Sequence, residues 1–337
     1  MIKSYETPLL SVTGLRKTYG GRPSLAQLLQ GKPARRLTAL DDVSLSLGRN
    51  EVLGIVGESG SGKSTIARCI IRLERPDQGE ITFGGQDVWQ ARGATLRGIR
   101  KDLQMIYQDP YGALNPRMSI GRAMAEPALV HGLIAKDSAR ALAFELLDRV
   151  GLPRSVAELT PLALSGGQRQ RVAIARALAL KPRVIIADEA VSALDASVQA
   201  QILNLFGELM RDLSLSMIFI SHQLSVIAHL ADRVAVMYLG RIVETGATAD
   251  VFARPRHPYT AALLKAHPHI EARRSQAPAL AGEIPSAYAI PAGCRFNTRC
   301  RFAEARCRAS DPPAAAFDHE HQAWCHVLPD LETHTNI

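Results

Sequence analysis

The residues best suited to chemistry in this chain form a glycine-rich run that ends in lysine and serine. The run Gly57-Glu58-Ser59-Gly60-Ser61-Gly62-Lys63-Ser64 fits the pattern G-x-x-x-x-G-K-[ST] at every position. Such a loop lets backbone N–H groups approach a triphosphate closely, and the helix that follows adds its positive dipole end. We expect Lys63 to reach the β- and γ-phosphates and Ser64 to ligate Mg²⁺. The predicted nucleotide ligands are Gly57, Ser59, Gly60, Ser61, Gly62, Lys63, Ser64 and Thr65.

A second group of polar residues ends two apolar runs farther along the chain. Asp188 and Glu189 follow the apolar residues 184–187, and His222 follows the run 217–220 after one serine. A carboxylate at a strand end can hold the Mg²⁺ shell, which is the role expected of Asp188. We expect Glu189 to be the general base that polarises the attacking water. The pair therefore predicts hydrolysis of the nucleotide.

These side chains need strands to place them. Open parallel α/β sheets bind ligands at the C-terminal ends of their strands, which is where Gly57, Asp188 and His222 fall. The predicted elements are strands over 9–19, 37–47, 51–56, 184–187 and 217–220, a helix over 64–73, and a closing hairpin over 234–238 and 241–244. The pattern indicates an α/β fold.

The stretch that separates the glycine-rich loop from the acidic pair is expected to be helical. Residues 96–164 contain helical patterns that four prolines interrupt, and they form a predicted helical subdomain. The interrupting residues are Pro110, Pro116, Pro127 and Pro153.

A further helix is predicted over 168–180, and the residues that open it form an anion site. The site consists of the Ser165 hydroxyl, the N–H groups of Gly166 and Gly167, and the positive end of the helix dipole. No strand feeds this helix, so the anion must come from elsewhere.

The run Leu164-Ser165-Gly166-Gly167-Gln168 resembles the signature of ATP-binding cassette (ABC) ATPases. The resemblance implies an α/β ABC ATPase nucleotide-binding domain with a P-loop core sheet, an antiparallel β subdomain and a helical subdomain. In that family two subunits close over two ATP molecules, and each signature binds the γ-phosphate held by the other subunit. The contacts implied across the dimer are Ser165, Gly166, Gly167, Gln168 and the D-loop residue Asp195.

Three more site residues come from the resemblance. Gln108 is similar to the Q-loop glutamine, which touches Mg²⁺ and water. His222 takes the place of the histidine that contacts the γ-phosphate, and Tyr19 the place of the aromatic residue that stacks on adenine. One departure is that Ala190-Val191 replaces the usual Pro-Thr after the catalytic glutamate, and neither missing residue carries the chemistry.

Two regions resemble the oligopeptide/dipeptide/nickel importer subfamily more specifically. One comprises 107–117 and 192–204, and the other is the tail, with 257–264 and 293–296. The implied function is to power uptake of di- and oligopeptides, with nickel, opines, glutathione or oligosaccharides as alternative cargo. The implied partners are a second homologous ABC ATPase in a heterodimer, two transmembrane permease subunits and, through them, a substrate-binding protein. The long loop after Tyr19 favours the second ATPase of such a pair.

Four of the five cysteines lie near the C-terminus, at Cys294, Cys300, Cys307 and Cys325. Four thiolates in a weakly structured tail can hold tetrahedral Zn²⁺ or an iron–sulfur cluster. Their spacing is wider than zinc sites favour, and the tail of peptide-importer ATPases is associated with a [4Fe-4S] centre. The cluster is therefore favoured over Zn²⁺ and over unligated thiols. Surface positions are favoured for the nearby His319, His321 and His326, and a buried position for Cys69.

Composition and length limit the remaining possibilities. With 337 residues and 47% apolar content, the chain can hold one large domain and an appendage. We expect a nucleotide-binding domain over 1–253 and an extension over 254–337, where proline, alanine, arginine and cysteine become frequent. The chain has no apolar stretch of 18 residues and no secretory signal at its start, which predicts that it stays in the cytosol. The resemblance to importer ATPases then implies peripheral attachment to the cytoplasmic face of the inner membrane, through partner subunits.

Nucleic acid is not an expected partner. The formal charge of +8 is spread along the chain rather than gathered in one block. ABC ATPases of DNA repair and chromosome organisation place a long coiled coil between phosphate loop and signature, whereas only about a hundred residues separate them here. Translation factors of the family carry two cassettes, and this chain has one of each motif. Transport is therefore favoured over a non-transport role on nucleic acid or ribosomes.

Overall fold

The computed structural model of the chain describes residues 7–20, 36–266, 282–283, 285–317 and 321–328. The loop that favoured the second ATPase of a pair lies mostly at 21–35, outside the described residues, as does His319. The chain forms two compact units. Unit 1 contains residues up to 10, 47–52 and 83–221, and unit 2 contains 11–46, 53–82 and 222–337.

Three parallel strands form the sheet of unit 1. β7 (Val184–Asp188) lies between β6 (Leu103–Ile106) and β8 (Ser216–Ser221), with Val184 opposite Leu103 on one side and Ser216 on the other. Every residue of β7 and β8 is buried, as expected for the continuous apolar runs of a parallel sheet. The strands predicted over 184–187 and 217–220 are therefore confirmed.

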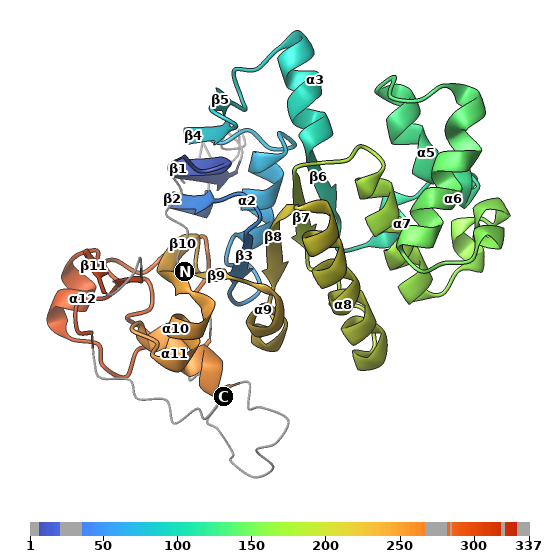
Figure 1. Cartoon of the computed structure of the whole chain (residues 1–337). Helices are drawn as coiled ribbons and strands as arrows, with labels where there is room; N and C mark the ends of the chain where they lie inside the picture. The colour runs from blue at the N-terminus through green and yellow to red at the C-terminus, as the bar shows by residue number, and fades with distance from the viewer. Residues whose placement is uncertain (1–6, 21–35, 267–281, 284, 318–320, 329–337) are drawn as a thin grey trace, which may run out of the picture. The chain divides into compact units, whose positions relative to one another are not determined.

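The helices of unit 1 include a group in which α5, α6 and α7 pack on one another (Figure 1). α7 also contacts β6 and α8, so it connects this helical group to the sheet. The helices are α3 (Gly93–Asp102), α4 (Pro110–Ala113), α5 (Ile120–Val130), α6 (Ala139–Arg149), α7 (Gly166–Leu178) and α8 (Ala196–Leu213), with a short strand β5 (Gln86–Asp87) before them. Three 3₁₀ turns cover Lys136–Ser138, Arg154–Glu158 and Pro161–Ala163.

The stretch 96–164 differs from the prediction in two places. It contains the strand β6, whose four residues are too few to show a period of two. Pro127 was predicted to interrupt a helix, yet it lies inside α5. A proline in a helix loses one backbone hydrogen bond, and the packing of α5 on both α6 and α7 compensates for that loss.

Unit 2 contains two groups of strands. In the first group the order is β2–β1–β4, with β1 at Leu10–Tyr19, β2 at Leu37–Leu47 and β4 at Gln78–Phe83. In the second group β3 (Val52–Val56) runs parallel to β9 (Arg233–Tyr238), and β10 (Arg241–Ala247) returns antiparallel to β9. The predicted hairpin is therefore confirmed.

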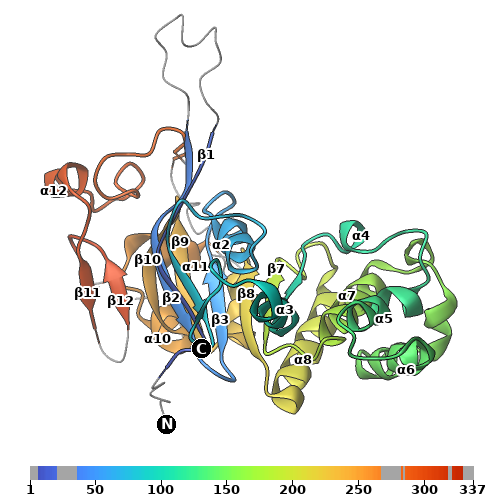
Figure 2. The same cartoon turned by 90° about the horizontal axis from the view of Figure 1, so that it is seen from above.

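The tail adds two strands to the second group. β12 (Gln322–Trp324) pairs with the edge of β10 and β11 (Ala314–Ala316) pairs with β12, both antiparallel (Figure 2). The expectation of a weakly structured tail is wrong for this segment. Strands of three residues, one of them all alanine, have little β-propensity, so the open edge of β10 specifies them rather than their own sequence.

Short helices complete unit 2. They are α2 (Lys63–Ile70), α9 (Leu224–Leu230), α10 (Thr248–Ala253), α11 (Pro258–Lys265) and α12 (Ala305–Ala309). Tyr238, Tyr259 and Phe296 form an aromatic cluster, with ring centroids 4.6 to 5.4 Å apart. Cys69 is fully buried in α2, as expected. None of the helices in the described part of the chain reaches the length and hydrophobicity that a membrane-spanning helix needs.

Candidate active site

The glycine-rich loop joins β3 to α2 in unit 2, as the sequence predicts. Gly62 has φ +104°, and a side chain there would overlap the carbonyl oxygen of Ala39, so only glycine fits. Ser59 and Gly60 are exposed at the tip of the loop, and Ser64 lies in the first turn of α2. The loop therefore leads its backbone N–H groups into the N-terminus of α2, which is the geometry of a phosphate site.

Lys63 is the first residue of α2, and its side chain turns back into this loop. Its ammonium group donates to the carbonyl oxygens of Gly57 at 2.8 Å and Glu58 at 3.0 Å, and the residue is only 4% exposed. The Ser61 hydroxyl is buried and has no hydrogen-bond partner among the described residues. An unpaired buried hydroxyl is costly, and a ligand oxygen in the loop would satisfy it. The loop thus brings together the positive charge of Lys63 and the unpaired hydroxyl donor of Ser61.

Tyr19 is the last residue of β1, on the same unit as the loop. Its hydroxyl donates to the Glu74 carboxylate, and the Lys17 ammonium lies 5.3 Å from the centre of its ring. Burial is the main reason why the pKa of Tyr19 is raised to about 12, while the nearby Thr65 side chain opposes that shift. The tether to Glu74 fixes the ring in one orientation, as a base-stacking platform requires.

The acidic pair lies at the end of β7 in unit 1. Asp188 is the buried last residue of the strand, and Glu189 follows it with φ +47°. The backbone N–H and the hydroxyl of Ser192 both donate to the Glu189 carbonyl oxygen, which supports this left-handed conformation. The Gln108 amide donates to the Glu189 carboxylate at 2.9 Å. The structure therefore brings the predicted base and the predicted Q-loop glutamine together.

The signature residues form a capping box at the start of α7. The Ser165 hydroxyl accepts from the Gln168 N–H at 3.3 Å, and the Gln168 side chain accepts from the Ser165 N–H at 2.9 Å. Gly166 and Gly167 occupy the first turn of the helix, as the predicted anion site requires. Because the hydroxyl oxygen accepts in the cap, its hydrogen can still donate to an anion.

Asp195 has a structural role that the sequence did not indicate. Its carboxylate caps α8 by accepting from the Val198 N–H at 3.2 Å, and it also accepts from the Ser197 hydroxyl. The bond from Ser197 is the largest of the causes that lower the pKa of Asp195. A Cβ atom at Gly167 would lie 2.5 Å from the Val198 side chain, so the first turns of α7 and α8 are in contact. The signature and the D-loop thus form one surface of unit 1.

The remaining predicted residues are His222, at the end of a strand, and the buried pair Ala190-Val191. His222 directly follows β8 and is exposed. Ala190 and Val191, which replace the usual Pro-Thr, are 3% and 2% exposed, so they pack in the core after the acidic pair.

The four tail cysteines lie near one another but do not form a recognisable ligand set. Burial raises the pKa of Cys294 to about 11, and neighbouring cysteines add to the shift. Among the described residues, no group of three or more His, Cys, Asp and Glu side chains is arranged to hold a metal ion. His321, expected at the surface, is instead 5% exposed and forms a 2.7 Å contact with the buried Glu244.

Sequence reasoning missed one contact of the loop. Glu58 occupies an unspecified position in the motif, yet its carboxylate pairs with Arg299 and its N–H donates to the Tyr259 hydroxyl. No local signal relates residues that are 241 and 201 positions apart.

Two family patterns and many relatives match the chain. Residues 40–192 match the ABC transporter family, and residues 243–307 match the oligopeptide/dipeptide transporter C-terminal region. A probable peptide ABC transporter ATP-binding protein of Sinorhizobium fredii is 48% identical over 86% of this chain and 82% of its own length. The dipeptide transport ATP-binding protein DppF of Escherichia coli is 46% identical over 88% of this chain and 87% of its own. The chain belongs to the ABC transporter family of ATP-binding proteins.

Solved structures of this family share the fold. A dimeric ATP-binding cassette in a post-hydrolysis state with ADP and Pi is 28% identical, with a TM-score of 0.62 over 71% of this chain and 98% of its own. The cassette cbiO1 of Clostridium perfringens, part of an ABC transporter complex, is 27% identical with a TM-score of 0.62, over 74% of this chain and 92% of its own. The ABC ATPase fold predicted from the signature is confirmed. As a member of this family, the chain is an ATPase of a membrane transporter.

Proposed function

We propose that this chain powers the import of di- and oligopeptides. The observation that carries the proposal is the match of residues 243–307 to the C-terminal region of oligopeptide/dipeptide transporters. Relatives named for peptide or dipeptide transport, 44–48% identical over most of the chain, support it. The import role places the chain at the cytoplasmic face of the membrane, bound to two permease subunits that receive substrate from a binding protein.

The site residues are proposed to act in a cycle of dimerisation and hydrolysis. The phosphate loop binds ATP through its N–H groups and Lys63, and Tyr19 stacks on the base. Ser64 and Asp188 would hold Mg²⁺, which supplies positive charge against the phosphates. Glu189 accepts a proton from the attacking water, positioned with Gln108 and His222. Ser165 and Gly167 bind the γ-phosphate on the opposite subunit.

Uptake by intact cells tests the cargo. Cells that lack this chain should fail to accumulate a radiolabelled dipeptide, and the wild-type chain should restore uptake. Excess unlabelled di- and oligopeptides should compete, whereas nickel, opines, glutathione and oligosaccharides should not. Competition by one of these other compounds, with none by peptides, would reassign the cargo while leaving the ATPase role intact.

We further propose that the second ATPase of the transporter is a different, homologous chain. The departure at Ala190-Val191 and the long loop after Tyr19 motivate this pairing. Purified alone with ATP and the Glu189→Gln substitution, the chain should stay monomeric by size-exclusion chromatography with light scattering. A stable and fully active homodimer of the wild-type chain contradicts the pairing.

We also propose a [4Fe-4S] centre at the four tail cysteines, with Zn²⁺ as the alternative. Burial and neighbouring cysteines raise the pKa of Cys294 and of Cys325, and this proximity, with the family match of the tail, motivates the proposal. Anaerobically purified protein should be coloured and give an EPR signal after reduction. Colourless protein with stoichiometric zinc, or with no metal, would eliminate the cluster.

A further inference from the structure

The C-terminal segment of the chain contacts the phosphate loop through one buried ion pair. The two terminal nitrogens of Arg299 donate to the two carboxylate oxygens of Glu58, at 2.7 and 3.1 Å. The Arg299 side chain is 3% exposed and that of Glu58 is 20% exposed. A two-pronged pair fixes the carboxylate in direction as well as in distance.

The guanidinium group of Arg299 is itself held in place by aromatic residues. It lies over the rings of Tyr238 and Phe296, 5.8 and 6.0 Å from their centres. One of its nitrogens also donates to the Tyr238 hydroxyl at 3.3 Å. Planar stacking and a shared hydrogen bond restrict the rotamers of Arg299, so the pair with Glu58 has a single geometry.

A second contact holds the backbone of the same loop residue. The Glu58 N–H donates to the hydroxyl of the buried Tyr259 at 2.9 Å. The Glu58 carbonyl oxygen then accepts from the Lys63 ammonium. Glu58 is therefore connected to Arg299 and Tyr259 on one side and to the phosphate-binding lysine on the other.

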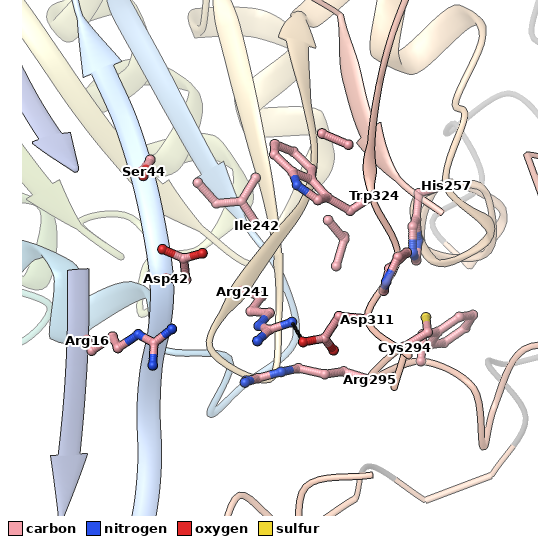
Figure 3. A pocket seen from close by; sticks show the side chains of 14 residues that line it. Arg16, Asp42, Ser44, Arg241, Ile242, His257, Cys294, Arg295, Asp311 and Trp324 are labelled. Carbon is pink, nitrogen blue, oxygen red and sulfur yellow. Dashed lines mark ion pairs between the residues drawn. The ribbon is translucent and has the colours of Figure 1, made fainter. Parts of the chain in front are cut away.

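The segment that carries Arg299 is anchored independently of the loop. Arg295 forms an ion pair with Asp41 of β2 and donates to the Leu239 carbonyl oxygen in the β9–β10 turn. Arg241 pairs with Asp311 at 2.8 Å beside a cavity of about 400 Å³ (Figure 3). With these anchors on either side of it in sequence, Arg299 acts on Glu58 from a fixed support.

The negative charge of Glu58 explains why its ion pair with Arg299 could affect ATP binding. A carboxylate in a phosphate loop repels the anion that the loop binds, unless a nearby cation compensates for it. We infer that Arg299 is a positioning residue of the ATPase, which neutralises Glu58 and holds the phosphate loop in its binding shape, so that the C-terminal segment sets the affinity for ATP. This inference rests on the proposed assignment of the loop as the ATP site.

Binding of Mg-ATP to the purified full-length chain, measured by isothermal titration calorimetry, tests the inference. Arg299→Met keeps an apolar stem in the aromatic cluster but removes the charge, and should raise the Kd about tenfold, equivalent to about 1.4 kcal/mol. Arg299→Lys restores the positive charge but not the planar guanidinium group that donates to both carboxylate oxygens, and it should recover part of the affinity. Removing the carboxylate as well, in Arg299→Met/Glu58→Gln, should return the Kd to within about threefold of wild type, because no unpaired charge remains.

Two controls accompany these variants. Arg306→Met removes another arginine of the tail, whose 2.8 Å pair with Glu304 is exposed, and should leave the Kd unchanged. Melting temperatures without nucleotide show whether each variant is folded. A merely structural role for Arg299 predicts that the double variant binds ATP as weakly as Arg299→Met, or more weakly.

The outcomes separate the inference from the proposed site. A folded Arg299→Met chain with wild-type affinity overturns the inference, provided that Lys63→Ala abolishes ATP binding. If Lys63→Ala binds ATP normally, the assignment of the loop itself fails, and the inference with it. Should Arg299→Met not fold, the double variant decides: an affinity close to wild type supports charge compensation, and a loss of tenfold or more contradicts it.

Discussion

Neighbouring residues fix the position of Glu189, the proposed general base. Ser192 holds its backbone in a left-handed conformation, and Gln108 donates to its carboxylate. The sequence indicated the roles of Glu189 and Gln108 through their motifs, but it could not indicate their direct hydrogen bond, because they are 81 residues apart. In the proposed mechanism the Glu189 carboxylate can accept from Gln108 and from the attacking water together, because an ionised carboxylate has several acceptor sites.

Replacing Glu189 with Gln should abolish ATP turnover at this site and leave ATP binding intact. The amide keeps the size of the side chain but cannot accept the proton of the attacking water. Phosphate release and equilibrium binding of Mg-ATP measure the two effects. Glu208→Gln, on the exposed face of α8, is the matched control and should hydrolyse ATP normally. Normal ATPase rates in Glu189→Gln would show that the base lies elsewhere.

His257 gives unit 2 a stability that depends on pH. It is 1% exposed, its Nδ1 accepts from the Tyr259 N–H at 3.0 Å, and burial lowers its pKa to about 4. An unfolded histidine has a pKa near 6.5. As the pH falls from 6.5 towards 4, the unfolded chain binds a proton that the folded chain does not bind, so stability is lost.

Between pH 7 and pH 5 the free energy of unfolding of unit 2 should fall by up to about 2 kcal/mol from this histidine. Urea unfolding followed by Trp324 fluorescence, in a Trp89→Phe background, measures the change. His257→Asn keeps an acceptor without a titrating ring and should flatten the pH dependence, whereas the exposed His229→Asn should not. Identical pH dependence in His257→Asn and the parent would exclude His257 as the cause.

The first turns of α7 and α8 form the surface that is proposed to meet the opposite subunit. The close approach of Gly167 and Val198 places the signature and the D-loop side by side. In this structure both Ser165 and Asp195 also cap their helices. Ser165 therefore combines a helix cap with the proposed anion site, and a substitution must be chosen that separates the two roles.

Ser165→Asp separates the two roles of that residue. Aspartate caps a helix as well as serine does, so α7 should retain its stability, whereas Ser165→Ala should lose about 1 kcal/mol. The negative charge of Asp should repel the γ-phosphate, and ATPase activity in the assembled transporter should fall at least about a hundredfold. Thermal melting and phosphate release measure the two effects. A Ser165→Asp transporter with wild-type activity would remove the signature from the proposed site.

The elements that the sequence predicted well are those with long or fully apolar patterns. The strands that end at Asp188, at Ser221 and before Gly57 all appear where their apolar runs indicate. The missed strands are β4, β5, β6, β11 and β12, which have six, two, four, three and three residues. Such strands are specified by the partner strand that they pair with, and no local pattern reveals a partner.

Over the whole molecule, the main difference from the sequence-based expectation is how closely the tail is joined to the nucleotide-binding part. The tail strands extend the edge of β10, and tail residues hold Glu58 of the phosphate loop. The sequence motifs predicted the tail and the nucleotide-binding part separately, but they did not predict any contact between the two. Residues on the two sides of the boundary proposed at 254 therefore pack together within unit 2.

A chain that ends at residue 293 should lose ATP binding and melt at a lower temperature. The deletion exposes the edge of β10, removes the Arg299 pair and leaves Asp41 without Arg295. A chain that ends at residue 328 keeps all of these contacts and is the control. Differential scanning calorimetry and Mg-ATP titration report the two effects, and a truncated chain that binds ATP like the control would show that the tail is a separate module.

The most direct measurement is peptide uptake into vesicles whose membrane contains the permease subunits. The binding protein and the labelled peptide are outside these vesicles, and ATP is inside. Labelled peptide should accumulate and phosphate should be released only when this chain is present, and Glu189→Gln should stop both together. Accumulation of peptide without this chain, or at the normal rate with Glu189→Gln, would contradict the claim that its ATP hydrolysis drives peptide import.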